Sequence, residues 1–311
     1  MSWQEDELHR WLSRRPRPAL LDGSRGHDAA VLAKAAGGRP VICVDQTIEG
    51  VHFEEGAAPK AWAAKAVART LSDLAATAAE PEAILLAFRA PSERSSAWMR
   101  SVLLGAEREA AKYGACVVAG DLAAAPGPAA LSVTALGRLA GKESPGRDRA
   151  EAGQVVLLTG PCGGSLPSGR HLSPQPKFAE GQWLFRAGAT AMMDVSDGVA
   201  IDLHRIARAS KVRITLEDLP VHRDAARLAK TSGRAPAWHA LHDGEDYELF
   251  ATISPSRWKR VAAEAAKRFP RLRLIGRVET GRGLQLSPDL AQAADLPCAW
   301  KMERGGFLHG S

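Results

Sequence analysis

The chain has 311 residues, of which 45% are hydrophobic and 24% charged, and its formal net charge is +6. These proportions are ordinary for a globular protein, and the length allows two domains with cores of their own. No apolar run reaches the roughly 18 residues of a membrane-spanning helix, so we expect no membrane association. Residues 1–6 carry acids where a secretory signal would be basic, which predicts a cytoplasmic protein.

The positive net charge suits an anionic ligand. Nucleic acid is not favoured, because aromatic residues make up only 5% of the chain, the basic residues are spread along it, and no nucleic-acid-binding motif is present. A small phosphorylated substrate needs the same sign of field. The 4 cysteines are scattered without a Cys-x-x-Cys pair, which predicts reduced thiols rather than a zinc site or a disulfide framework.

The first half of the chain alternates strand and helix patterns. Its predicted elements are, in order, a helix over 3–12, paired strands over 29–32 and 41–44, a helix over 59–79 that begins at Pro59, a strand over 83–88, a helix from the cap Ser92 to Tyr113, and strands over 115–119 and 131–139. Residues 141–153 are rich in charge, Gly and Pro. They predict a boundary between domains of residues 1–145 and 146–311.

The second half continues the alternation after a Gly-, Pro- and Ser-rich loop over 160–176. Its predicted elements are strands over 154–159, 191–195, 212–217, 248–253 and 272–278, and helices over 180–187, 199–209 and 255–269. Strands that alternate with helices in both halves predict an α/β or α+β fold with two domains.

Carboxylates recur in apolar or small-residue surroundings, and they give the strongest functional signal. They are Asp28, Asp45, Asp73, Asp121, Asp194 and Asp197. We expect the strand over 41–44 to end at Asp45 and to deliver this carboxylate to a cavity. An isolated carboxylate is costly to bury, and several of them in one chain favour a bound cation.

Each of these signals has a plainer interpretation. Asp73 lies four residues after Arg69 on a predicted helix and could simply pair with it. Ser196 or Asp197 could merely cap the helix that follows, whereas the same junction could instead present backbone N–H groups to an anion. The acidic loop over 242–248 could be a solvated loop, although Tyr247 and the following strand tie it to the core.

Five motifs, taken in chain order, resemble thiamine-monophosphate kinases, of the superfamily that includes aminoimidazole ribonucleotide synthetase and selenophosphate synthetase. The motifs are Gly26-His27-Asp28-Ala29-Ala30-Val31, Asp45 with Glu49-Gly50-Val51-His52-Phe53, Leu71-Ser72-Asp73-Leu74-Ala75-Ala76, Met193-Asp194-Val195-Ser196-Asp197-Gly198 and Gly244-Glu245-Asp246-Tyr247-Glu248-Leu249. The resemblance covers nearly the whole chain. It implies an aminoimidazole-ribonucleotide-synthetase-like fold, with a mixed amino-terminal sheet and a carboxy-terminal α/β domain.

The resemblance also implies an activity: transfer of a phosphoryl group from ATP to thiamine monophosphate, assisted by several Mg²⁺ ions, in a homodimer associated through its amino-terminal sheets. The six aspartates above would be the metal ligands, with no protein base. The nucleotide would contact Gly120, Asp121, Arg147 and Ser196, and the substrate would contact His52, Glu245 and Phe307. A Mg²⁺ cluster suits this chemistry, because transfer between two polyanions needs charge neutralisation and alignment.

The chain departs from the family pattern at His27, Cys43, Val44, Leu122 and Ala123. These departures affect residues beside the mapped aspartates and leave all of those aspartates in place. We therefore read the chain as a divergent kinase. The alternative is a paralogue that binds a nucleotide or phosphorylated ligand without transfer, or that acts on a different substrate. A selenophosphate synthetase is disfavoured, because no Cys lies in the amino-terminal segment.

Overall fold

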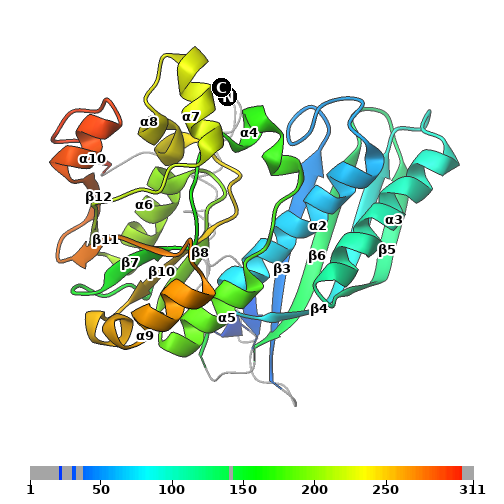
Figure 1. Cartoon of the computed structure of the whole chain (residues 1–311). Helices are drawn as coiled ribbons and strands as arrows, with labels where there is room; N and C mark the ends of the chain where they lie inside the picture. Colours follow the sequence, from blue (N-terminus) through cyan, green and yellow to red (C-terminus); the bar gives the residue numbers. More distant parts are fainter. Residues whose placement is uncertain (1–20, 23–29, 33–37, 140–142, 303–311) are drawn as a thin grey trace.

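A computed structural model describes residues 21–22, 30–32, 38–139 and 143–302 of the chain, with two sheets and their flanking helices (Figure 1). The first sheet has the order β1-β2-β3-β6-β4-β5 and is antiparallel except for the parallel pair β4 and β5. Its strands are β1 (Leu21–Asp22), β2 (Ala30–Leu32), β3 (Arg39–Ile48), β4 (Glu80–Ala90), β5 (Cys116–Ala124) and β6 (Ala130–Leu139). The predicted pairing of residues 29–32 with 41–44 is confirmed by the β2–β3 register.

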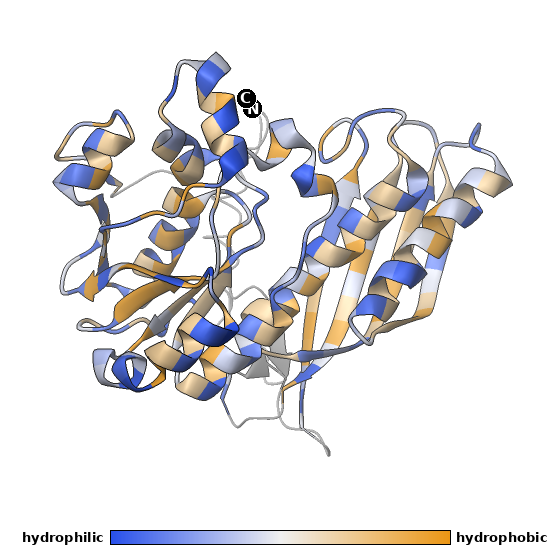
Figure 2. Cartoon of the chain, viewed as in Figure 1, coloured by the Kyte–Doolittle hydropathy of each residue, from blue (hydrophilic) through white to orange (hydrophobic). Residues whose placement is uncertain are grey.

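One face of this sheet is covered by α2 (Pro59–Ala76) and α3 (Ser96–Lys112), which lie in front of the strands in Figure 1. The period-2 pattern of β3 explains the arrangement, because Val41 and Cys43 are buried while Val44 is 63% exposed. The indole of Trp62 is fully buried and stacks on Phe53 with ring centroids 4.5 Å apart. Figure 2 shows apolar and polar residues in alternating bands along both helices.

The second sheet has the order β13-β12-β9-β11-β7-β10-β8, in which only β12 and β9 pair in parallel. Its strands are β7 (Val155–Leu158), β8 (Ala191–Asp194), β9 (Arg213–Leu216), β10 (Leu249–Ile253), β11 (Arg273–Glu279), β12 (Gly283–Leu286) and β13 (Lys301–Met302). Side chains of successive strand residues pack alternately into two hydrophobic cores. One core includes α6 (Val199–Ser210), α8 (Pro236–His242) and α10 (Pro288–Ala293), and the other includes α5 (Phe178–Ala187) and α9 (Pro255–Arg268).

Helix α2 joins the two halves. Its last residue, Ala76, belongs to the same core cluster as Trp183 and Leu184 of α5. A Cβ added to Gly181 of α5 would lie 2.3 Å from the carbonyl oxygen of Ala75, so only glycine permits this approach. One face of α2 therefore builds the first core, and its carboxyl end packs against the second half.

Several boundaries differ from the sequence prediction. Helix α3 begins at Ser96, because the side chain of Ser95, rather than Ser92, accepts a hydrogen bond from the N–H of Trp98. Strand β3 does not end at Asp45: it pairs with β6 as far as Ile48. Strand β5 likewise continues beyond Gly120 through Asp121, because β4 supplies partners as far as Ala124.

Short elements were missed altogether. They are β1, α4 (Ser165–Ser168) and the 3₁₀ helix η1 (Arg170–Leu172) within the predicted loop, α7 (Arg223–Ser232), α8, α10, β12 and β13. The predicted helix over 3–12 lies outside the described residues. Among the helices that are described, none combines the length and the apolar character needed to cross a membrane.

Candidate active site

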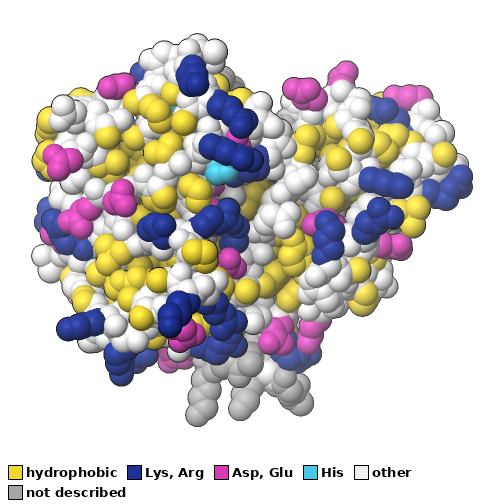
Figure 3. Space-filling model, in the orientation of Figure 1, with side chains coloured by type: hydrophobic (Ala, Val, Ile, Leu, Met, Phe, Trp, Pro, Cys, Tyr) yellow, Lys and Arg dark blue, Asp and Glu magenta, His cyan; other side chains and the backbone are white. Residues whose placement is uncertain are grey.

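A polar stripe runs along α2 where the helix faces the second half. Lys65, Arg69 and Asp73 recur every four residues, so they lie on one face of the helix. The hydrogen-bond partners described for Lys65 and Arg69 lie outside α2, and one partner of Lys65 belongs to the second half. Figure 3 shows Lys and Arg side chains gathered along the boundary between the two halves.

Lys65 connects the two halves directly. Its side chain is fully buried, and its ammonium donates hydrogen bonds to the carbonyl oxygen of His52 at 2.6 Å and to Oε2 of Glu245 at 2.5 Å. Burial lowers the pKa of Lys65, while the charge of Glu245 acts in the opposite direction. The ion pair therefore fixes Glu245 of the second half against the loop that carries His52.

One turn further along α2, the guanidinium of Arg69 contacts Asp45 across a 3.4 Å ion pair from Nη2 to Oδ1. Burial alone would lower the pKa of Arg69, but acidic groups from both halves outweigh that effect and raise the pKa. These groups are Tyr247, Asp45, Glu245 and Asp73. The interpretation of Asp73 as a simple partner of Arg69 is therefore incomplete, because the ion pair described for Arg69 is with Asp45 of β3.

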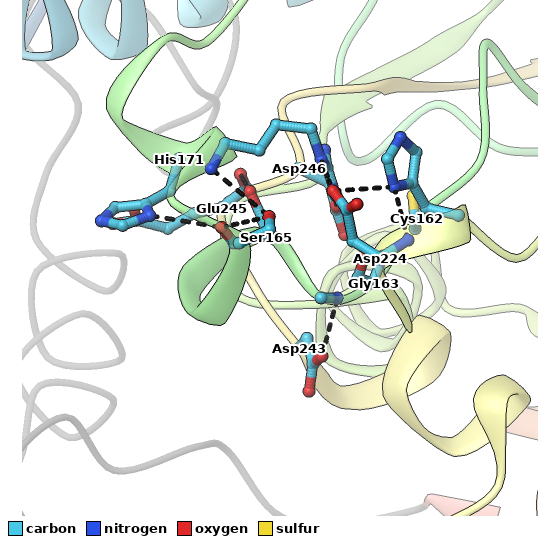
Figure 4. A network of polar contacts seen from close by, with 12 residues as sticks. Cys162, Gly163, Ser165, His171, Asp224, Asp243, Glu245 and Asp246 are labelled. Atoms are coloured by element: carbon cyan, nitrogen blue, oxygen red, sulfur yellow. Dashed lines mark hydrogen bonds and ion pairs between the residues drawn. The ribbon is translucent and has the colours of Figure 1, made fainter. Parts of the chain in front are cut away.

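The acidic loop over 242–248 is not solvated: Asp246, Tyr247 and Glu248 are 6%, 2% and 5% exposed. Its carboxylates have separate partners, several of which Figure 4 shows at close range. Asp243 accepts from the N–H of Gly164 at 2.8 Å, Asp246 accepts from the N–H of Gly163 at 2.8 Å and from Arg170 at 2.7 Å, and Glu248 accepts from Thr159 at 2.5 Å and pairs with Lys177 at 3.0 Å. The loop thus anchors the Gly-rich segment that follows β7.

Two residues of this loop have left-handed backbone conformations. The φ angles are 61° at Glu245 and 53° at Tyr247, which non-glycine residues rarely adopt. The conformation is held by the hydrogen bond from the Glu245 N–H to the carbonyl of Ser196 at 2.7 Å and by that from the Tyr247 N–H to the carbonyl of Val195 at 2.9 Å. Backbone strain of this kind concentrates at functional sites.

The exit of β8 is also held from within the protein. Asp202 of α6 is fully buried and accepts hydrogen bonds from the N–H groups of Ser196 and Asp197, both at 2.9 Å. Arg205 pairs with Asp197 and Asp202. The residue that caps α6 is Gly198, which makes no side-chain hydrogen bond, so capping by Ser196 or Asp197 is not confirmed. The N–H groups of Ser196 and Asp197 already donate to Asp202, so they are not free for an anion.

The structure brings part of the predicted carboxylate set together. The charges of Asp45 and Asp73 both raise the pKa of Arg69, and the charge of the buried Asp194, at the end of β8, raises the pKa of Tyr247. Asp197 lies just beyond β8 and is engaged with Arg205. Asp28 and Phe307 lie outside the described residues.

Asp121 does not join this group within the chain. The register of the first sheet places Asp121 in one row with Ala87, Ser132 and Gln46, whereas Asp45 lies in the neighbouring row with Gly120. Adjacent rows point to opposite faces of a sheet, so Asp121 faces away from α2. Arg147 lies in the segment between the two sheets, where its carbonyl oxygen accepts a hydrogen bond from Ser210 at 2.8 Å.

Residues 26–139 match the family described as AIR synthase related protein, N-terminal domain. A thiamine-monophosphate kinase of Rhodopirellula baltica is 38% identical over 222 residues, which are 70% of this chain and 69% of the relative. A thiamine-monophosphate kinase of Mycobacterium tuberculosis is 34% identical over 276 residues, 82% of each chain. The chain belongs to the thiamine-monophosphate kinase family. This membership confirms the resemblance, and AaThiL complexed with AMPPCP and TMP has the same fold, with a TM-score of 0.80, 25% identity and coverage of 96% of each chain.

Lys65 of this thiamine-monophosphate kinase family member was not predicted from the sequence, and Arg69 was predicted only as a partner of Asp73. A signal was available, because beyond Lys60 in its first turn a helix that is otherwise rich in Ala and Leu carries its charges at 65, 69 and 73. The partners in the other half could not be read from the sequence. Arg170, which pairs with Asp224 and Asp246, lies in a segment predicted to be loop and had no such signal.

Proposed function

We propose that this protein transfers the γ-phosphoryl group of ATP to thiamine monophosphate and so forms thiamine diphosphate and ADP. In this reaction a phosphate oxygen of thiamine monophosphate forms a bond to the γ-phosphorus. The bond from that phosphorus to the β–γ bridging oxygen breaks, and its electron pair remains on ADP. The acceptor oxygen is already anionic, so the transfer requires no protein base.

The observation that carries this proposal is the junction at α2, in a chain whose family and fold match thiamine-monophosphate kinases over most of its length. Charged groups from both halves converge there: Lys65 with Glu245, and Arg69 with Asp45. Phosphoryl transfer requires charge compensation and alignment, and both are supplied by a rigid set of opposite charges.

We assign roles to the remaining residues by the family pattern. His52, Glu245 and Phe307 would contact the thiamine monophosphate, and Lys65 holds the first two of these positions together. Gly120, Asp121, Arg147 and Ser196 would contact the nucleotide. The anchoring of the Ser196 backbone by Asp202 supports a fixed position for that residue.

The metal proposal is that Mg²⁺ is held by Asp28, Asp45, Asp73, Asp194 and Asp197. Asp121, the sixth ligand of the family pattern, faces away from Asp45 within the chain. Carboxylate oxygens are the ligands that Mg²⁺ prefers, so the donor chemistry of this set fits. Among the described residues no group of three or more candidate ligands is spaced to hold an ion. Bound Mg²⁺ would neutralise phosphate charge at this site.

We propose further that the protein is a cytoplasmic homodimer that associates through the face of the first sheet opposite α2 and α3. This face carries the exposed Val44. It also carries Asp121, so association there would place that carboxylate in the dimer interface. The domain division is proposed at residues 145 and 146, between the last strand of the first sheet and the first strand of the second.

The proposal is tested by incubating the purified protein with ATP, Mg²⁺ and thiamine monophosphate and separating the thiamine esters by chromatography. We expect thiamine diphosphate to form in step with ADP, and to stop forming when EDTA is added. Binding of thiamine monophosphate without turnover in the complete mixture would instead identify a non-catalytic paralogue.

A further inference from the structure

The 3₁₀ helix η1 brings a histidine to the boundary between the two halves. Helix η1 contacts α2, and its Leu172 packs against the core of the first half. The preceding residue, His171, is partly exposed and lies near the buried Lys65 and its partner Glu245, whose charges act on the pKa of the imidazole. Figure 4 shows His171, Ser165 and Glu245 together at one side of the polar network. His171 is not among the residues implied by the family pattern.

Ser165 couples His171 to Glu245. The fully buried Ser165 donates its hydroxyl to the carbonyl oxygen of Glu245 at 2.7 Å, and its own carbonyl oxygen lies 3.2 Å from Nδ1 of His171. A carbonyl oxygen only accepts, so Nδ1 carries the proton in this contact. Burial, and then the charge of Lys65, lower the pKa of His171 against the opposing charge of Glu245. At neutral pH the imidazole is therefore uncharged, and its Nε2 keeps a lone pair.

Two acceptor atoms remain without donors at this point. The described residues give Nε2 of His171 no hydrogen-bond partner. The ammonium of Lys65 contacts only Oε2 of Glu245, and no described residue donates to Oε1. Neither Nε2 nor Oε1 is one of the buried polar atoms without a partner, so solvent reaches both. A ligand that matches this point brings hydrogen-bond donors or positive charge.

The organic part of thiamine monophosphate has this character. Its thiazolium ring carries a permanent positive charge and its pyrimidine ring carries an amino group that donates, whereas its ionised phosphate only accepts. Asp73, a proposed metal ligand, lies two steps of four residues beyond Lys65, which is roughly 12 Å along the helix axis. An elongated substrate with its phosphate toward Asp73 would place its rings beside Glu245 and His171.

We propose that His171 is a substrate-binding residue that selects thiamine monophosphate by accepting, at Nε2, a hydrogen bond from the amino group of the pyrimidine ring. The inference rests on the proposed kinase function and names the contact that would decide which pyrimidine the site accepts. The plainer role of His171, a tie between η1 and Ser165, uses Nδ1 alone and requires nothing of Nε2.

His171→Asn separates the two roles, because an asparagine amide can still donate to the Ser165 carbonyl in place of Nδ1 but has no atom at the position of Nε2. His222→Asn is the matched control: His222 is also a partly exposed histidine of the second half, and asparagine can keep its contact as the N-cap of α7. Calorimetry gives the Kd of thiamine monophosphate and of the analogue whose pyrimidine carries hydrogen in place of the amino group. Rate measurements give kcat and both KM values, and thermal melting reports folding.

In the wild type, we expect the analogue to bind about 3- to 10-fold more weakly than thiamine monophosphate, which corresponds to one neutral hydrogen bond. In His171→Asn the two ligands should bind equally well, because the acceptor that distinguishes them is gone. The KM for ATP and the melting temperature should stay close to the wild-type values. The control should keep the wild-type ratio of the two Kd values.

A His171→Asn protein that keeps the wild-type ratio, or a wild type that does not distinguish the two ligands, would overturn the proposal and leave His171 as a structural tie of η1. If His171→Asn does not fold, His171→Ala, which also lacks Nε2, gives the same comparison. Failure of the kinase proposal gives a different result, because the wild type would then form no thiamine diphosphate, whatever ratio the two ligands show.

Discussion

Replacement of Lys65 by methionine would test whether α2 holds together His52 and Glu245, the residues proposed to contact the substrate. Methionine keeps most of the length and volume of the side chain but removes the ammonium, which contacts the His52 carbonyl and the Glu245 carboxylate at 2.6 and 2.5 Å. Breaking a fully buried ion pair costs about 3–5 kcal/mol. The Glu245 side chain is 17% exposed and can be hydrated, and burial of the Lys65 ammonium itself is unfavourable, so we expect a smaller loss of about 1–3 kcal/mol.

The functional effect of Lys65→Met should be selective. The backbone of Glu245 remains anchored, because its N–H donates to Ser196 and its carbonyl accepts from Ser165 at 2.7 Å. Only the carboxylate loses its orientation. The KM for thiamine monophosphate should therefore rise while the KM for ATP changes little.

Urea unfolding and initial rates at varied concentrations of each substrate measure both effects. Lys60→Met is the control, because Lys60 is an exposed lysine at the start of the same helix. A Lys65→Met protein as stable as the wild type, or one whose two KM values rise equally, would refute the reasoning.

Three further predictions follow from the same contacts. Asp73→Asn should abolish phosphoryl transfer with little change in the urea midpoint of unfolding. If Asp73→Asn and Arg69→Gln instead have equal and mild effects, under ~0.5 kcal/mol in stability, Asp73 is only a helical ion-pair partner of Arg69. Burial raises the pKa of Asp246 to about 6, above its ordinary value of 3.8, so its contribution to stability should be complete below about pH 4 and decline as the pH rises through 6. Burial also raises the pKa of Asp202, to about 7, so urea midpoints from pH 4 to 7.5 should decline in both proteins but more steeply in the wild type than in Asp246→Asn; parallel curves would contradict the assignment. Cys43 is 5% exposed, and its thiol donates a hydrogen bond to the Thr70 carbonyl at 3.2 Å. Cys43→Ser should therefore lower stability by ~1–3 kcal/mol and leave unchanged the Mg²⁺ concentration that gives half the maximal rate. A lower Mg²⁺ concentration at half-maximal rate would mean that position 43 contributes to the metal site.

The main elements could be predicted because their patterns are local. The helix that begins at Pro59 has its helical periodicity, and the strand that ends at Asp194 is a short buried run, each within consecutive residues. Strand ends were less predictable, since β3 and β5 extend past Asp45 and Asp121 only because neighbouring strands supply hydrogen-bond partners. Such pairing depends on residues far away in the chain.

The site was predictable as a set of motifs but not as a set of contacts. The motif around Glu245 marked the loop, yet an acidic loop reads as solvated until its partners, such as Lys65 and Gly163, are known. Asp121 illustrates the converse. The family pattern implied a shared metal site with Asp45, and the sheet register places the two on opposite faces.

The most direct test of the account is a single-turnover transfer with [γ-³²P]ATP, Mg²⁺ and thiamine monophosphate. We predict that the label appears in the terminal phosphate of thiamine diphosphate at the rate at which labelled ATP disappears, and that unphosphorylated thiamine accepts none. Label released only as inorganic phosphate, or thiamine diphosphate that forms without label, would contradict direct phosphoryl transfer to thiamine monophosphate.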